Sequence, residues 1–243
     1  MMPLGKLYGI GIGPGDPELI TLKGARLLGE CRHVFVPKAR TAADSIAMKI
    51  AGRYLRADGR VHELVFPMTA NRVELDARWE EAARLVAAVL QKGEEACFLT
   101  LGDPLLYSTY IYLLRALRAL LPELEAVTVP GVTAFSAVAS LTEFTVGEGK
   151  EPVAIVPTTD DLAGVKRALA AGGTVVIMKI GKKLKELLSL LEDAGLIEEG
   201  VFVSRAGLDG QRIETDLRKL QPDDPETGYL SLILVHAGRR KKR

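Results

Sequence analysis

Short runs of apolar residues alternate along the chain with longer stretches in which apolar residues recur every three or four positions. In the first half, the short runs predict strands over 6–12, 33–36, 62–66, 96–101 and 126–129. The longer stretches predict helices over 21–30, 44–55, 72–93, 105–121 and 132–141. This alternation is typical of a parallel sheet that is covered by helices.

A polar, glycine-containing stretch at 142–151 separates this series from a second one. The second series predicts helices over 161–171 and 182–194, and strands over 152–157, 174–179, 201–204, 212–217 and 229–236. No clear helix separates its last three strands, which indicates a partly antiparallel sheet. We therefore predict an α/β fold of two domains in series, 1–147 and 148–243, each with a mainly parallel sheet.

Charge and composition narrow the possible partners. The net charge is +1, so the chain has no broad basic surface and nucleic acid is not expected as a partner. No apolar run approaches the roughly 20 residues that a bilayer helix needs, and no signal peptide is apparent. We expect a cytoplasmic protein with no membrane partner. Cys31 and Cys97 lack metal-ligand spacing, so buried free thiols and no bound metal are expected.

The glycine-rich stretch GIGPGDPELIT, residues 11–21, follows the first predicted strand. It fits neither the dinucleotide-binding fingerprint nor the P-loop in any register. Pro14 has no N–H to donate, and Asp16 places a negative charge where a phosphate would lie. The glycines let the backbone approach a ligand closely, and Pro14 is expected to hold Gly13 extended. These features favour a stiff loop beside a flat ligand that is neutral or cationic.

Two further strand ends share this pattern of glycine and proline. Gly102-Asp103-Pro104 follows the strand at 96–101, and Pro130-Gly131 follows the strand at 126–129. We expect Asp103 to cap the helix that comes after it. Because the carboxyl ends of parallel strands lie at one edge of a sheet, the three loops together predict a ligand site there.

These residues resemble the tetrapyrrole methylase family, whose members transfer a methyl group from S-adenosylmethionine. The resemblance rests on residues 11–21, 100–110, 129–135, 176–179 and 230–235, which occur in family order. VPK at 36–38, VFPMT at 65–69 and YSTY at 107–110 are most similar to the branch that methylates carbon 20 of precorrin-2, or its cobalt-containing counterpart, in cobalamin biosynthesis.

The resemblance implies a homodimer of two-domain chains, with a ligand cleft between the domains and no metal bound by the enzyme. It implies S-adenosylmethionine as methyl donor and a tetrapyrrole as substrate. The donor-binding residues that it implies are Gly102, Asp103, Pro104, Leu105, Tyr107, Ser108, Thr109, Thr133, Ala134, Met178, Lys179, Arg205, Ala206, Leu230 and Ser231. Gly13, Pro14, Gly15 and Lys38 would contact the substrate.

Methyl transfer also needs a proton to leave carbon 20, and the sequence leaves its acceptor open. Asp16 is the candidate base and Asp103 is a second. The alternative is that no protein base is needed, because the substrate itself delocalises the charge. A cationic rim is expected for the substrate carboxylates. The candidates that follow strand ends, Lys38, Lys179 and Arg205, are favoured over Arg53 and Arg72. His33, His62 and His236 are interpreted as hydrogen-bonded structural residues.

Two other functions remain open at this point. A methylase of the same fold can act on another corrinoid precursor, a protein or ribosomal RNA. A carrier that binds a corrinoid or nucleotide without turnover is the second alternative, and it would not need the donor-binding residues.

Overall fold

The computed structural model describes residues 3–39, 45–66, 72–221 and 227–238. The chain divides into two compact units, Met1–Thr133 and Ala134–Arg243. This division lies upstream of the boundary expected at 147/148. The reason is that the helix which follows Thr133 packs against the second sheet, where Val138 is buried with Leu232 and Leu234.

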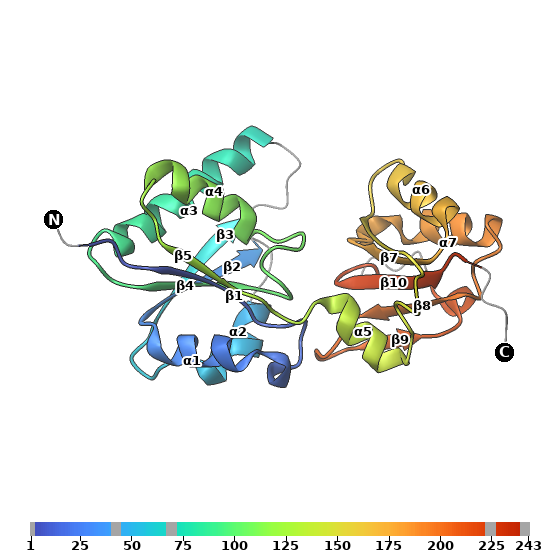
Figure 1. Ribbon diagram of the computed structural model, residues 1–243, viewed down its shortest axis with the longest axis horizontal. Coiled ribbons are helices and arrows are strands. Elements are labelled where there is room, and N and C mark those ends of the chain that lie inside the picture. The colour runs from blue at the N-terminus through green and yellow to red at the C-terminus, as the bar shows by residue number, and fades with distance from the viewer. Residues whose placement is uncertain (1–2, 40–44, 67–71, 222–226, 239–243) are drawn as a thin grey trace. The chain divides into compact units, whose positions relative to one another are not determined.

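The first unit contains a five-stranded sheet in the order β3-β2-β4-β1-β5. All of its strand pairs are parallel. Two helices cover each face, α1 and α2 on one and α3 and α4 on the other (Figure 1). The bounds are β1 Leu7–Gly11, α1 Leu22–Glu30, β2 His33–Ala39, α2 Ile46–Ala51, β3 Arg60–Phe66, α3 Arg72–Leu90, β4 Ala96–Thr100, α4 Tyr110–Leu120 and β5 Ala126–Val129.

Helix α1 shows how the local sequence sets an element of this unit. The Thr21 hydroxyl accepts a hydrogen bond from the Gly24 N–H at 3.1 Å, which satisfies one of the donors left free at a helix start. Leu27 and Leu28 are buried one turn later, while Arg26 forms an ion pair with Glu30 on the solvent side. Each buried leucine contributes about 1.5–3 kcal/mol relative to an exposed one.

Several element bounds in the first unit differ from the sequence prediction, and two of the differences have a clear physical reason. Strand β2 continues through Pro37, which lies opposite Leu64 of β3. Its pairing with β4 ends at Phe35, so the missing N–H of Pro37 breaks no hydrogen bond on that side. Helix α4 begins at Tyr110 rather than at residue 105, because residues 101–109 form a loop.

The second unit has a five-stranded sheet in the order β6-β7-β10-β8-β9. Among the described strands of this unit, only β6 and β7 pair in parallel. The expected mainly parallel sheet is therefore wrong here, and the expected antiparallel strands are confirmed. Helices α6 and α7 cover one face and α5 lies on the other (Figure 1). The bounds are α5 Ala134–Thr142, β6 Val153–Pro157, α6 Ala163–Ala171, β7 Thr174–Met178, α7 Leu184–Asp193, β8 Gly200–Ser204, β9 Arg212–Glu214 and β10 Ser231–His236.

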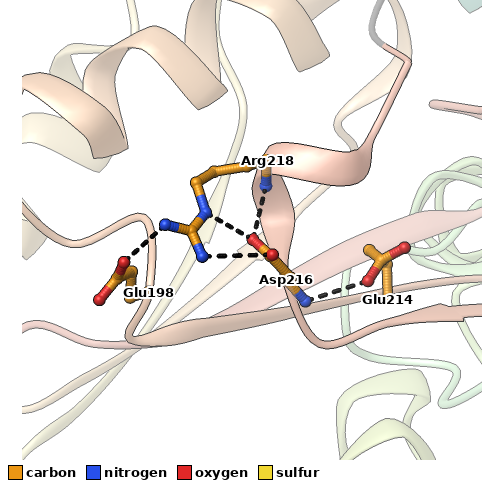
Figure 2. Close-up of polar contacts among 4 residues, drawn as sticks. All are labelled: Glu198, Glu214, Asp216 and Arg218. Carbon is orange, nitrogen blue, oxygen red and sulfur yellow. Dashed lines mark hydrogen bonds and ion pairs between the residues drawn. The ribbon is translucent and has the colours of Figure 1, made fainter.

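A cluster of charged residues fixes the turn after β9 (Figure 2). The Arg218 guanidinium donates to Asp216 at 2.8 Å and to Glu198 at 2.7 Å. Asp216 also accepts the Arg218 backbone N–H at 3.2 Å, and its own N–H donates to Glu214 at 3.0 Å. Because these groups are exposed, the cluster defines local geometry more than it adds stability. Across the described residues, no helix combines the length and apolar character that crossing a membrane requires.

Candidate functional site

Three loops of the first unit lie at one edge of its sheet. The first loop, 12–17, follows β1; the second, 101–109, follows β4; and the third, 130–133, follows β5. Since β4, β1 and β5 are neighbouring parallel strands, their carboxyl ends share this edge. This is the edge at which open α/β sheets bind ligands.

Glycines at this edge let the three loops pack directly on one another. A Cβ added at Gly11 would lie 2.7 Å from the Gly102 carbonyl oxygen, and one added at Gly131 would overlap the same oxygen. Gly13 has a φ of +79°, which glycine adopts readily, so the expectation that Pro14 holds it in an ordinary extended conformation is wrong. Gly11 and Gly131 therefore serve contact between loops, not only the approach of a ligand.

Hydrogen bonds join the same three loops. The Gly102 N–H donates to the Gly13 carbonyl oxygen at 2.8 Å, linking the second loop to the first. One Asp103 carboxylate oxygen accepts the Leu105 N–H at 2.8 Å, and the other accepts the Gly131 N–H at 3.1 Å. The expectation that Asp103 caps a helix is wrong, because α4 starts only at Tyr110. Asp103 instead shapes its own loop and binds the third.

The rest of the second loop divides into supporting and outward residues. Ser108 is buried and its hydroxyl donates to the Pro104 carbonyl oxygen. Leu105 and Tyr107 are 59% and 38% exposed, so this polar loop presents two large apolar side chains to solvent. Gly102 and Pro104 are buried, whereas Thr109 is half-buried. The loop therefore keeps its shape through its buried residues and exposes two side chains suited to contact a ligand.

The first loop is braced at its end. One Asp16 carboxylate oxygen accepts the Glu18 N–H at 2.8 Å and caps a short 3-10 helix, η1 Pro17–Leu19. The Tyr54 hydroxyl donates to the Pro17 carbonyl oxygen at 2.9 Å. Gly13, Pro14 and Gly15 are buried and Asp16 is half-buried. The structure thus gives Asp16 a capping role through one of its two oxygens.

Backbone strain is concentrated at positions predicted to bind the donor. Within the described residues, six residues other than glycine have positive φ. Four of them were predicted as donor-binding residues, namely Tyr107, Lys179, Arg205 and Leu230, with φ of 51°, 59°, 52° and 49°. Such conformations cost of the order of 1–3 kcal/mol each and cluster at ligand sites.

Three of these strained residues lie at one edge of the second sheet. Lys179 follows β7, Arg205 follows β8, and Leu230 precedes β10. Strand β10 is antiparallel to both neighbours and pairs Leu232 with Met178, so the three positions are adjacent. The Arg205 N–H donates to the Leu230 carbonyl oxygen at 2.9 Å.

Three of the remaining predicted residues of the second unit, Met178, Ala206 and Ser231, lie at this edge too. Met178 ends β7 and is half-buried, and Ala206 is buried next to Arg205. Ser231 is buried, and its hydroxyl donates to the Gly228 carbonyl oxygen at 2.8 Å. Ala134 begins the second unit, whereas Thr133 ends the first. Apart from Ala134, which begins α5, the predicted donor-binding set therefore falls into two groups, one at each sheet edge.

The candidate cations differ in their surroundings. Lys38 donates to Glu63 at 2.9 Å, and 20% of its side chain is exposed, so its charge is already compensated. Lys179 is exposed to solvent over part of its surface. The protein around it still displaces enough water to lower the pKa of its amine by desolvation. The Arg53 guanidinium lies 5.5 Å from the Tyr54 ring centroid. The side chain of Arg72 lies outside the described residues.

Two residues that the sequence did not single out support these edges. Tyr54 braces the first loop, and Thr158 donates through both its N–H and its hydroxyl to the Met178 carbonyl oxygen, at 2.8 and 3.0 Å. Thr158 directly follows β6, so its position at a strand end is a signal that the sequence contains. Nothing local in the sequence links Tyr54 to Pro17.

The three histidines lie away from both edges and are hydrogen-bonded, as predicted. His33, the first residue of β2, bonds to Glu94 and to His62, each at 2.9 Å. His236, the last residue of β10, bonds to the Thr174 hydroxyl at 3.1 Å. Cys31 and Cys97 are buried and free, as expected. In the described part of the chain, no group of three or more His, Cys, Asp or Glu residues is arranged to hold a metal ion.

Comparison with known proteins shows the family to which the chain belongs. The family described as Tetrapyrrole (Corrin/Porphyrin) Methylases matches residues 6–221. The chain belongs to the tetrapyrrole methylase family. The matched range includes the three loops of the first unit and both Lys179 and Arg205 of the second.

Two curated members of this family are similar over nearly their whole length. The cobalt-precorrin-2 C(20)-methyltransferase of Salmonella typhimurium is 35% identical over 232 residues, which is 96% of this chain and 96% of that protein. The precorrin-2 C(20)-methyltransferase of a Sinorhizobium species is 30% identical over 240 residues, which is 96% of this chain and 95% of that protein.

A solved structure of a family member shares the fold. The uroporphyrin-III C-methyl transferase of Thermus thermophilus, complexed with S-adenyl homocysteine, aligns with a TM-score of 0.64 at 24% identity. The alignment covers 96% of this chain and 92% of that one. The α/β architecture predicted from the sequence is therefore that of the family.

Proposed function

We propose that this protein is a methyltransferase that transfers a methyl group from S-adenosylmethionine to carbon 20 of precorrin-2 or cobalt-precorrin-2 in cobalamin biosynthesis. The reaction is inferred from the two full-length relatives. One is named for the cobalt-containing substrate and the other for precorrin-2 itself, so we propose both as candidate substrates. The structural observation that carries the proposal is the left-handed backbone of Tyr107, Lys179, Arg205 and Leu230, which coincides with predicted donor positions.

The donor would be bound by loop backbone and by a few side chains. In the first unit we assign this role to Thr133 and to the second loop, apart from the Asp103 carboxylate, whose two oxygens already accept backbone N–H groups. In the second unit we assign it to Ala134, Met178, Lys179, Arg205, Ala206, Leu230 and Ser231. Backbone strain of this kind clusters at ligand sites, which supports the assignment of Tyr107, Lys179, Arg205 and Leu230 to donor binding.

The reaction is a direct displacement and needs no metal ligand from the protein. One bond forms between carbon 20 and the methyl group while the sulfur–methyl bond breaks, and S-adenosylhomocysteine leaves with the electron pair of that bond. The protein must hold the carbon and the methyl in line, about 3–3.5 Å apart before transfer, and keep water out. The buried residues of the loops provide the rigidity that this alignment needs.

The proton on carbon 20 leaves after methylation. Asp103 is not suited to accept it, since both of its oxygens accept backbone N–H groups. Asp16 uses one oxygen to cap η1, so its second oxygen remains for this role, and we retain Asp16 as the candidate base. A carboxylate that acts as a base must come within hydrogen-bond reach of the proton, directly or through one water.

The substrate would lie against Gly13, Pro14 and Gly15 of the first loop. Lys38 would leave its ion pair with Glu63 and bind one of the substrate carboxylates instead. This exchange is feasible because ion pairs at the surface contribute little free energy. We further propose a homodimer. Its measured mass in solution would then be twice the 26.2 kDa of the chain. Two buried free thiols suit the reducing cytoplasm, where we place the protein.

Turnover tests this proposal. The purified protein is incubated with S-adenosylmethionine and either metal-free or cobalt-loaded precorrin-2, and the macrocycle is followed by mass spectrometry. We expect one added methyl group on at least one of the two substrates, and the ratio of the two rates identifies the preferred form. No added methyl on either substrate, with both intact and the protein folded, would contradict the proposal.

A further inference from the structure

Asp103 connects two loops that are distant in the sequence. Its first carboxylate oxygen holds the Leu105 N–H of its own loop at 2.8 Å. Its second oxygen reaches the Gly131 N–H of the third loop at 3.1 Å. The bond to Gly131 therefore spans from the end of β4 to the end of β5, two strands that both flank β1 in the sheet.

The packing at Gly131 makes this connection demanding. A side chain at Gly131 would overlap the Gly102 carbonyl oxygen, so the two backbones are in direct contact. The Gly102 carbonyl group can only accept hydrogen bonds, so it cannot form one with a carbonyl group of the third loop. A carboxylate that accepts an N–H from each loop supplies the missing link, and hydrogen bonds to a charged group are stronger than neutral ones.

We propose that Asp103 is a positioning residue, which holds the third loop against the second so that both form one preformed surface for the methyl donor. The proposal rests on the proposed function, since it assumes that the donor binds at these loops. It differs from the sequence-based roles of Asp103 as a helix cap, a base or a direct ligand. Its carboxylate acts through Gly131 and Leu105.

The carboxylate can be tested by a nearly isosteric change. Asp103→Asn keeps one acceptor oxygen and replaces the other by an NH₂ group. Whichever way the amide turns, it can no longer accept the N–H groups of both Leu105 and Gly131. Asp103→Ala removes both bonds. We expect faster amide exchange at 129–133 in both ligand-free variants, and about tenfold weaker binding of S-adenosylhomocysteine in Asp103→Asn. Tenfold corresponds to ~1.4 kcal/mol.

A matched control comes from the second unit. Asp216 accepts the N–H of Arg218 two residues later, just as Asp103 accepts that of Leu105, but it bonds to no loop at the predicted donor site (Figure 2). Asp216 lies beside η4, Leu217–Lys219, which packs near Gly200 at the start of β8. The predicted donor residue Arg205 follows the opposite end of β8, so Asp216 is separated from it by the length of the strand. Asp216→Asn should change neither exchange at 129–133 nor donor affinity.

The two measurements separate the possible outcomes. The full chain is studied by hydrogen–deuterium exchange without ligand and by calorimetric titration with S-adenosylhomocysteine, after circular dichroism confirms folding. Weaker binding with unchanged exchange would show that Asp103 contacts the donor directly, and faster exchange with unchanged binding would show a merely structural role; either result overturns the proposal. If the wild type itself binds no S-adenosylhomocysteine, the proposed function fails and the positioning role fails with it.

Discussion

Lys179 shows how a single strained residue connects backbone energy to ligand binding. It has a φ of 59° although it carries a side chain, and it is exposed at the edge of the second sheet. Glycine adopts this conformation without the steric cost of a Cβ. The left-handed conformation of Lys179 therefore lowers the stability of the fold, and we interpret this conformation as a requirement of donor binding.

Lys179→Gly should raise stability while it weakens binding. We expect the free energy of unfolding to rise by about 0.5–1 kcal/mol. Relief of the left-handed strain, about 1–2 kcal/mol, exceeds the free-energy cost of the conformational freedom that glycine adds to the unfolded chain. S-Adenosylhomocysteine should bind more weakly, by about tenfold for the loss of a charged contact. Thermal denaturation and calorimetric titration measure the two effects.

Glu143 provides the matched control for this prediction. It is exposed, has a φ of 52°, and lies at none of the predicted donor positions. Glu143→Gly should give a similar gain in stability with unchanged donor affinity. Equal loss of affinity in both variants, or none in either, would disagree with a specific role for Lys179.

The surroundings of His62 make the stability of the protein depend on pH. His33 is buried and bonds to both His62 and Glu94, and the His62 ring stacks on Phe35 at 4.5 Å between centroids. Partial burial lowers the pKa of His62, and the charges of His33 and Arg60 lower it further. Because the pKa of His62 is lower in the folded than in the unfolded state, the unfolded chain takes up the proton first.

Acidification from pH 7.5 to 5.5 should therefore destabilise the protein. This window spans the unfolded pKa of about 6.5 and lies above the range in which Glu94 titrates. The free energy of unfolding, measured with urea at each pH, should fall more steeply in the wild type than in His62→Gln. Parallel pH profiles in the two proteins would contradict the assignment of this effect to His62.

At the scale of elements, the first loop depends on a brace from a different part of the chain. The Tyr54 hydroxyl lies at the end of η2, Gly52–Tyr54, and donates to the Pro17 carbonyl oxygen. Tyr54→Phe removes this bond and little else. A neutral hydrogen bond contributes about 1 kcal/mol, so we expect a roughly fivefold higher KM for the tetrapyrrole, with the affinity for S-adenosylhomocysteine unchanged.

Tyr8→Phe is the control, because it removes a tyrosine hydroxyl near the opposite end of β1. That hydroxyl donates to Glu95 at 2.9 Å on the exposed surface. Its loss should leave both the KM for the tetrapyrrole and the affinity for S-adenosylhomocysteine unchanged. A change in donor affinity with Tyr54→Phe would instead show that the first loop also serves the donor.

The sequence predicted most elements because their apolar periodicity is strong, and it failed where loops imitate helices. Leu105 and Leu106 continue the apolar pattern of α4, yet the left-handed Tyr107 and the bond from Ser108 to Pro104 form a turn instead. The motifs identified the loops through their glycines and prolines. The link from Asp103 to Gly131 had no local signal, since it depends on the order of strands in the sheet.

At the scale of the whole molecule, the division into two units follows packing rather than composition. The polar stretch at 142–151 looked like a linker, but Phe144 within it stacks on His236 with ring centroids 4.0 Å apart. Helix α5 before it is buried against β10. Both therefore belong to the second unit, and the sequence alone did not show which sheet would bury them.

The position of the transferred methyl group tests the central claim most directly. The protein is incubated with precorrin-2 and S-adenosylmethionine that carries ¹³C in its methyl group, and the product is analysed by ¹³C NMR. We predict a single new labelled methyl attached to carbon 20, and S-adenosylhomocysteine in equal amount. A label on any other carbon, or donor consumed without a labelled macrocycle, would contradict the account.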